Sequence, residues 1–336
     1  MNAHDRYKQR GSCTHLSEQE ENGAMIKKSL LVPAVVCLLF FPRPSWGGTM
    51  LLQENFDDAQ FASRGWYDAP AGTISTVEHI PGSTGSFECK FVKGAIGCSG
   101  GAPKRHALTP TDQVYVSFWI KHSSTWVGSG TTFHPHLLYF LTNLDGSTVG
   151  PAYTHMTAYV EENQGYPLLA FQDGVNIDET RVGVDLTNST ENRATGGCNG
   201  TQPGIGQFHV DCYLSGTVHW NGVQWRSATP SFFDPNQMTN WHFVEAYFQL
   251  NTTSNGMGQP DGIVRYWYDG QLVIDHSNVL FRTGKNPTMQ FNQFLLSPYI
   301  GNGSPADQTI WFDSLTIATS RPGSAAPSPP LNLRVQ

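Results

Sequence analysis

Two-residue alternation of apolar and polar side chains is the dominant pattern of this chain. In residues 114–121, the apolar side chains of Val114, Val116, Phe118 and Ile120 share one face of an extended segment. No run longer than about ten residues shows a convincing 3.6-residue period, so the pattern predicts an all-β protein. Further predicted strands cover residues 136–142, 155–162, 168–172, 241–250, 263–268, 271–275 and 310–317.

The clearest turn signal is the Asp269-Gly270 pair between two alternating runs. Asp-Gly supplies the positive φ angles that a two-residue hairpin turn requires. We therefore predict a β-hairpin at residues 261–275. By contrast, residues 174–235 are rich in glycine and break the alternation, so we expect a long loop region there.

The N-terminal region has the pattern of a secretory signal peptide. Two lysines precede an apolar run at residues 30–41, and small residues follow it. That run is shorter than the roughly 20 apolar residues that a membrane helix needs. We expect residues 1–24 to be a non-native extension and residues 25–47 to be the signal. The predicted product is secreted, extracellular or periplasmic, with no membrane insertion after signal removal.

The remaining chain divides into a large domain and a tail. With 34 Gly, 21 Pro and 14% charged residues, the composition is typical of a β-protein, and residues 48–320 are enough for one large sandwich. Residues 321–336 are rich in Pro and Ser and are expected to form a linker. Its end resembles the first strand of a fibronectin type III module, which would be truncated here.

The charge balance excludes some partners. Six of the 20 basic and four of the 27 acidic residues precede residue 48, which leaves 14 against 23 and a net charge of −9. A broad surface for nucleic acid or anionic membranes is therefore not expected. We expect a monomer.

Four cysteines remain after the signal region, and in an exported chain they predict two disulfides. Three pairings are open. We favour Cys89–Cys98 and Cys198–Cys212, because each closes a short loop between turn-rich segments. Zinc binding is the alternative, but the spacings differ from the close cysteine pairs of structural zinc sites.

Three segments carry a resemblance to a known family. They are Trp241-His-Phe-Val-Glu-Ala-Tyr-Phe-Gln-Leu-Asn251, residues 261–270, and Ile310-Trp-Phe-Asp-Ser-Leu-Thr-Ile317. This pattern resembles the C-terminal half of polysaccharide lyase family 14 and related concanavalin-like lyases. The resemblance implies a concanavalin-like jelly-roll β-sandwich of two antiparallel sheets, with a concave sheet that binds an acidic polysaccharide.

The catalytic motifs of that family are not reproduced. Family 14 lyases carry a lysine in a Gly-Lys segment, a Ser-x-Arg pair and a Tyr-x-Tyr pair. The corresponding places hold Phe-His-Pro-His-Leu at residues 133–137, Tyr-Thr-His-Met-Thr at 153–157 and Leu-Ala-Phe-Gln at 169–172. A lyase here would need different groups.

β-Elimination requires a neutraliser for the uronate carboxylate, a base and an acid, and His, Tyr and Gln can fill these roles. His134 and His136 have the same parity, as do His155 and Tyr159 on the next predicted strand, with Gln172 on the one after. We predict that these five side chains converge as catalytic residues. The alternative is that the first two histidines pin a loop around a proline.

Four residues are predicted to extend the binding groove, because sugar rings stack on aromatic faces. Trp220 and Trp225 lie in the expected loop region, and Arg265 and Tyr268 lie near the Asp-Gly hairpin. Packing in or over the core is the alternative for the tryptophans.

Two other functions stay open. One is a non-catalytic carbohydrate-binding, lectin-like or adhesion module. The other is a glycoside hydrolase, which requires two carboxylates about 5 to 10 Å apart. The Glu-x-Asp-x-x-Glu motif of sandwich glucanases is absent, and neighbouring Glu161 and Glu162 cannot share one strand face.

No cofactor is expected for catalysis, but a structural calcium ion is. Glu54, Asp57 and Asp58 lie at the first strand and Asp313 lies in the last one. The terminal strands of such a sandwich commonly meet, and hard oxygen ligands suit calcium. The alternative is that these aspartates are turn residues or cap a strand end.

Overall fold

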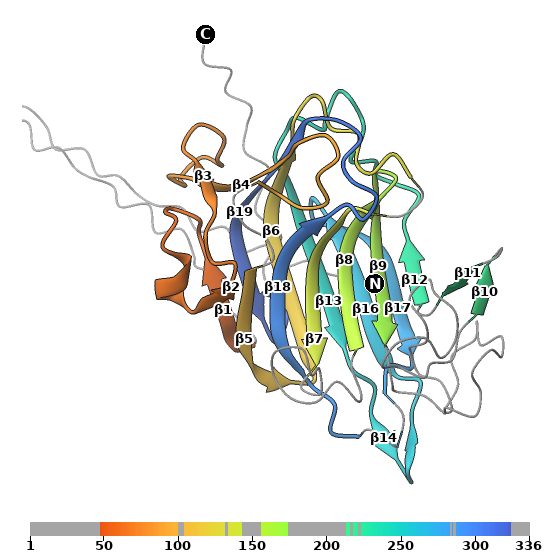
Figure 1. The fold of residues 1–336 in the computed structure, drawn as a ribbon. Helices are drawn as coiled ribbons and strands as arrows, with labels where there is room; N and C mark the ends of the chain where they lie inside the picture. The colour runs from red at the N-terminus through yellow and green to blue at the C-terminus, as the bar shows by residue number, and fades with distance from the viewer. Residues whose placement is uncertain are drawn as a thin grey trace, which may run out of the picture. The chain divides into compact units, whose positions relative to one another are not determined.

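The computed structural model describes residues 48–99, 104–131, 134–142, 156–173, 213–215, 218–220, 223–282, 284 and 287–323. These residues form two large antiparallel sheets (Figure 1). The short 3-10 helix η1 (Phe61–Arg64) is the one helical element among them, and none of the described helices could span a membrane. The predicted all-β class is confirmed.

The first sheet has eight strands in the order β17-β16-β13-β6-β19-β4-β3, with β1 also paired to β19. The terminal strands therefore meet, as expected from the sequence. Its strands are β1 (Met50–Glu54), β3 (Thr73–Ser75), β4 (Ser86–Phe91), β6 (Gln113–His122), β13 (His242–Gln249), β16 (Gly262–Tyr268), β17 (Gln271–Val279) and β19 (Gln308–Ala318).

The second sheet has seven strands in the order β12-β9-β8-β7-β18-β5-β2. They are β2 (Trp66–Asp68), β5 (Lys104–Thr111), β7 (His136–Thr142), β8 (Met156–Asn163), β9 (Tyr166–Asp173), β12 (Val223–Arg226) and β18 (Phe291–Tyr299). Two small two-stranded ladders pair β10 (Tyr213–Ser215) with β11 (Val218–Trp220) and β14 (Thr253–Ser254) with β15 (Met257–Gly258).

The core lies between the two large sheets. The apolar face predicted for residues 114–121 is buried there, and Phe248 of β13 contacts Phe140 of β7 with ring centroids 6.1 Å apart. On β7 and β8 the core side chains include Leu138, Phe140 and Val160. Because side chains alternate along a strand, the residues between them lie on the outer face of the seven-stranded sheet, turned away from the core.

The predicted hairpin is confirmed. Asp269 and Gly270 connect β16 to β17 with φ angles of 48° and 80°. The expected loop region 174–235 is wrong at three short strands. β10 and β11 pair with each other, and residues 223–226 form the edge strand β12 against β9. Strand β18 was missed, because a register irregularity and Pro298 interrupt its alternation.

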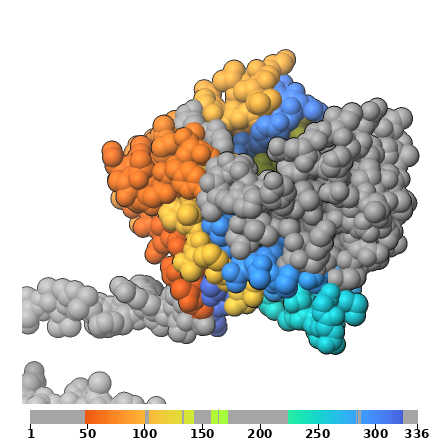
Figure 2. Space-filling model, turned by 60° about the horizontal axis from the view of Figure 1, so that its bottom comes forward, coloured from red at the N-terminus to blue at the C-terminus, as the bar shows by residue number. Residues whose placement is uncertain are grey.

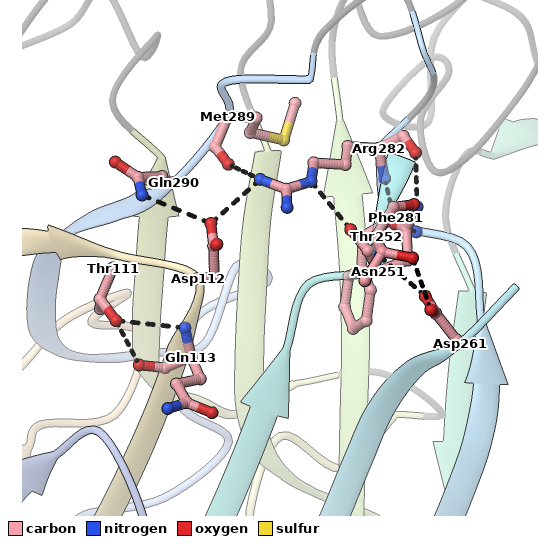
Figure 3. A network of polar contacts seen from close by, with 10 residues as sticks. All are labelled: Thr111, Asp112, Gln113, Asn251, Thr252, Asp261, Phe281, Arg282, Met289 and Gln290. Carbon is pink, nitrogen blue, oxygen red and sulfur yellow. Dashed lines mark hydrogen bonds and ion pairs between the residues drawn. The ribbon is translucent and has the colours of Figure 1, made fainter. Parts of the chain in front are cut away.

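A buried arginine ties together the loops at one end of the sandwich (Figure 3). Arg282, 7% exposed, donates from Nε to the carbonyl of Asn251 (2.9 Å) and from Nη1 to Asp112 Oδ1 (3.0 Å) and the carbonyl of Met289 (2.6 Å). The amide oxygen of Asn251 accepts the backbone N–H groups of Phe281 and Arg282. This network joins segments next to β6, β13, β17 and β18, so it fixes both sheets at this end.

Candidate functional site

Histidine and tyrosine side chains gather on the outer face of the seven-stranded sheet. Tyr139 pairs with Tyr159 across β7 and β8, and His136 pairs with Tyr299 across β7 and β18. Directly paired residues of antiparallel strands share a face. These four residues, together with His134 and Glu161, are called the histidine–tyrosine cluster below. Figure 2 shows a hollow in the surface with yellow-green atoms, the colour range of β7 to β9, visible inside it.

His136 is the centre of this cluster. Its ring centroid lies 4.5 Å from that of His134, 4.6 Å from that of Tyr159 and 5.5 Å from that of Tyr139. The Tyr299 ring is nearly parallel to it, with 9° between the planes and 6.0 Å between the centroids. The imidazole is therefore enclosed by aromatic rings on several sides.

A buried carboxylate orients the His136 ring. Glu161 is 3% exposed, and its Oε1 makes a short contact with His136 Nδ1. A carboxylate accepts hydrogen bonds, so this contact places the hydrogen on Nδ1 and leaves Nε2 as the acceptor of the neutral ring. The pair also satisfies a carboxylate that would be costly to bury alone.

His134 is held from two sides. Its Nδ1 accepts the backbone N–H of Gly301 (3.1 Å), and its carbonyl accepts the hydroxyl of Ser129 (3.0 Å). Burial, with an electrostatic contribution from the neighbouring His136, lowers the pKa of His134 to about 4. The ring is consequently neutral at physiological pH, and since Nδ1 is an acceptor, Nε2 carries the hydrogen. Its φ of 64° is rare for a residue other than glycine.

Two tyrosines of the cluster, Tyr139 and Tyr159, can act as proton donors. Burial, together with the nearby Tyr159 and Glu161, raises the pKa of Tyr139 well above its usual value. Burial and Glu161 also raise the pKa of Tyr159. Both phenols therefore keep their protons at neutral pH, so they can supply a proton more readily than remove one.

Polar side chains continue this face toward β5 and β2. Tyr67 donates to Gln293 Oε1 (3.5 Å), and Gln293 is fully buried. Arg105 pairs with Leu295 across β5 and β18, and its Nε contacts Asp68. These groups offer hydrogen-bond donors beside the cluster.

The structure brings together three of the five predicted catalytic residues, His134, His136 and Tyr159. Gln172 lies in β9 with its backbone opposite Thr157, and its side chain is outside the described part of the structure. His155 lies outside the described residues. The chemical roles of these residues stay predictions.

Three of the four predicted groove residues do not join the cluster. Tyr268 is a core residue with its ring 4.9 Å from that of Phe232, because its parity on β16 turns it inward. Arg265 lies in the other sheet and pairs with Asp275 (2.8 Å). Trp225 packs against Phe171 at 5.0 Å, since it belongs to β12 and not to a loop.

The side chain of Trp220 lies outside the described residues, and so do Cys198 and Cys212. The predicted Cys89–Cys98 disulfide is present.

Tyr139, Glu161 and Tyr299 were missed by the sequence reasoning. Strict alternation places His136 and Tyr139 on opposite faces, but a register shift between His136 and Leu138 brings them to the same one. Glu161 has the parity of Tyr159, which was a usable signal.

The carboxylates predicted to bind calcium have protein partners. Glu54 accepts from Arg64 Nε (2.8 Å) and from Trp66 Nε1 (2.9 Å). Asp57 accepts from the hydroxyl of Thr84 (2.6 Å).

Asp58 pairs with Arg64. Asp313 accepts from the backbone N–H of Ile80 (3.0 Å), and burial raises its pKa to about 6. The described residues contain no group of three or more His, Cys, Asp or Glu side chains placed to hold a metal ion.

Comparison with known proteins identifies the fold. No protein-family model matches the chain, and no curated protein matches it. The crystal structure of the marine PL-14 alginate lyase from Aplysia kurodai is similar over 81% of this chain and 99% of that chain, with 11% identity and a TM-score of 0.53.

An endo-β-1,4-glucuronan lyase from the fungus Trichoderma reesei matches over 82% of this chain and 92% of its own, with 14% identity and a TM-score of 0.42. The binding domain of Paraclostridial Mosquitocidal Protein 1 matches over 82% and 49%, with 8% identity and a TM-score of 0.39. The similarity to the Aplysia enzyme confirms the predicted jelly-roll β-sandwich fold.

Proposed function

We propose that this protein is exported, binds an acidic polysaccharide on the outer face of the seven-stranded sheet and cleaves it by β-elimination. The observation that carries the proposal is the placement of His136 between Glu161 and three tyrosines on that face. The jelly-roll fold shared with an alginate lyase supports it.

The arrangement assigns one base and one acid. Nε2 of His136 is the acceptor left by the Nδ1–H···Glu161 contact, so it takes the proton from C5 of the uronate. The C5–H electrons form the C4=C5 double bond as the C4–O bond breaks. A tyrosine phenol, from Tyr139 or Tyr159, gives its proton to the leaving oxygen. No water is consumed, and the proton on His136 later returns to the phenolate.

The uronate carboxylate must be neutralised before C5 becomes acidic enough to lose a proton. The Nε2–H of His134 is a neutral donor beside the base, since its Nδ1 accepts from Gly301. Tyr67 lies along the same face, where its hydroxyl donates to the fully buried Gln293. In this proposal hydrogen bonds stabilise the uronate carboxylate, in place of the lysine and arginine of family 14 lyases.

The hydrolase alternative fits less well. Glycoside hydrolysis requires two carboxylates flanking the bond, and Glu161 is the one carboxylate in the histidine–tyrosine cluster, where His136 already engages it. A binding module would use the same aromatic rings without proton transfer.

A substrate screen separates these three functions. The protein is incubated with alginate, glucuronan, pectate and glycosaminoglycans while the ultraviolet absorbance of the C4=C5 product and the reducing ends are both measured. We expect absorbance and reducing ends to rise together on at least one polyuronate. Reducing ends without absorbance would indicate a hydrolase, and affinity with neither signal would indicate a binding module.

Export is part of the same proposal. The charged and apolar pattern of residues 25–47 supports a signal peptide. The Cys89–Cys98 disulfide supports an oxidising compartment. Expression of the full sequence in a bacterial host with fractionation tests it, since a cytoplasmic, uncleaved product would contradict export.

A further inference from the structure

The loop closed by the disulfide lies directly against the segment that leads out of β18. The N–H of Gly94 donates to the carbonyl of Ser304 (2.7 Å), and the N–H of Ser304 donates to the carbonyl of Ala95 (2.8 Å). The N–H of Ile300 donates to the carbonyl of Ile96 (2.8 Å). Residues 94–96 and 300–304 are thus joined through their backbones.

The same segment carries two parts of the histidine–tyrosine cluster. Tyr299, whose ring is parallel to that of His136, forms an isolated β-bridge with Gly97. Gly301 donates its N–H to His134 Nδ1. The loop therefore contacts the backbone that sets the position of one tyrosine and the tautomer of one histidine.

Close approach at two glycines makes this contact sensitive to small displacements. A Cβ on Gly301 would lie 2.5 Å from Cε1 of His134. A Cβ on Gly303 would lie 2.7 Å from the carbonyl oxygen of Gly94 and 3.0 Å from its carbonyl carbon. Any side chain at Gly303 must push the two backbones apart.

A second loop supports the site from another side. Gln308 donates from Nε2 to the carbonyl of Gly128 (2.7 Å) and to the hydroxyl of Ser304 (2.7 Å). Ser129, next to Gly128, donates to the carbonyl of His134. His134 is consequently positioned by two loops that both meet at Ser304.

We propose that residues 89–98, closed by the Cys89–Cys98 disulfide, are a positioning element that holds Tyr299 and His134 against His136. The disulfide limits the movement of the loop, and the loop fixes residues 299–304 through backbone hydrogen bonds. The consequence for catalysis rests on the proposed function, but the positioning itself does not.

The test substitutes Gly303 with alanine, with Gly256→Ala as the matched control. Both glycines have positive φ angles, 81° and 75°, so both variants share the cost of placing an alanine in the left-handed region. A Cβ on Gly256 meets nothing within 4 Å. The two substitutions therefore differ in the contact with Gly94.

The main readout is the ¹⁵N NMR signal of the His134 ring, which reports its tautomer without any substrate. We expect Gly303→Ala to shift this signal toward a mixture of tautomers and Gly256→Ala to leave it unchanged. If the protein cleaves polyuronates, kcat/KM of Gly303→Ala falls about 10-fold, equivalent to about 1.4 kcal/mol. An unshifted His134 signal in folded Gly303→Ala would overturn the proposal, whether or not the protein is a lyase.

Reduction of the disulfide in the folded protein is a second test that needs no substitution. Thiol reagent should produce the same displacement of the His134 signal while the circular dichroism of the sheets stays unchanged. A reduced, folded protein with the native His134 signal would show that the disulfide has no positioning role.

Discussion

The buried Lys104 should make folding stability rise with pH in the alkaline range. Its side chain is fully buried, and Nζ lies 5.1 Å from the centroid of the Phe61 ring and 4.7 Å from that of Phe87. Nζ also donates to the carbonyls of Ala69 and Ala71. Even with these partners, burial lowers the pKa of Lys104 from 10.5 to about 8.

The direction of this pH dependence follows from the number of protons that Lys104 binds in each state. Between pH 8 and 10.5 the unfolded chain binds more protons at this lysine than the folded chain does, so the free energy of unfolding rises with pH. A difference of about two and a half pKa units corresponds to about 3 kcal/mol across that window. Other groups titrate there too, so the quantity to measure is the difference between the wild type and Lys104→Met.

Urea unfolding at intervals from pH 7.5 to 10.5 provides this difference. We expect the wild type to gain stability relative to Lys104→Met by about 3 kcal/mol over the range, because methionine carries no titrating group. The exposed Lys90→Met is the control and should follow the wild-type profile. Parallel pH profiles for wild type and Lys104→Met would show that the pKa of Lys104 does not differ between the folded and unfolded states.

Three further predictions concern the site, the fold and the metal. Glu161→Gln should lower kcat/KM on a polyuronate about 10- to 100-fold, because the orientation of His136 is lost. Glu88→Gln is the control and should keep the wild-type kcat/KM. Equal activity in both variants would argue against an orienting role for the Glu161 carboxylate. Arg282→Met should lower the free energy of unfolding in urea by about 2 to 4 kcal/mol, because it removes the buried network in Figure 3. The partly exposed Arg265→Met should cost less than about 1 kcal/mol, and a reversed order would contradict the role of the network. Calcium added after EDTA treatment should raise the Tm if the predicted structural ion binds, and an unchanged Tm would exclude a stabilising ion.

The fold was largely predictable because the core faces of the long strands alternate regularly. The 114–121 segment and the Asp269-Gly270 hairpin illustrate this, since each combines a clear period with a clear turn. Strand β18 escaped detection because its register shifts twice against β7, so that no single two-residue period runs through it. Local patterns identify strands only where the pairing is regular.

The candidate site was predictable only in part, because it depends on long-range pairing. His134, His136 and Tyr159 were found from parity within nearby strands. Tyr299 reaches His136 through the pairing of β18 with β7, which joins residues far apart in the sequence. Tyr268 was misplaced because proximity to a turn says nothing about which face of a strand a residue occupies.

A comparison of two histidine variants tests whether His136 is the base. Initial rates of C4=C5 product formation are measured on the best polyuronate for wild type, His136→Ala and the exposed His276→Ala. We predict a loss of at least about 100-fold in kcat for His136→Ala and wild-type rates for His276→Ala. Product formation by His136→Ala at the wild-type rate would show that His136 is not the base.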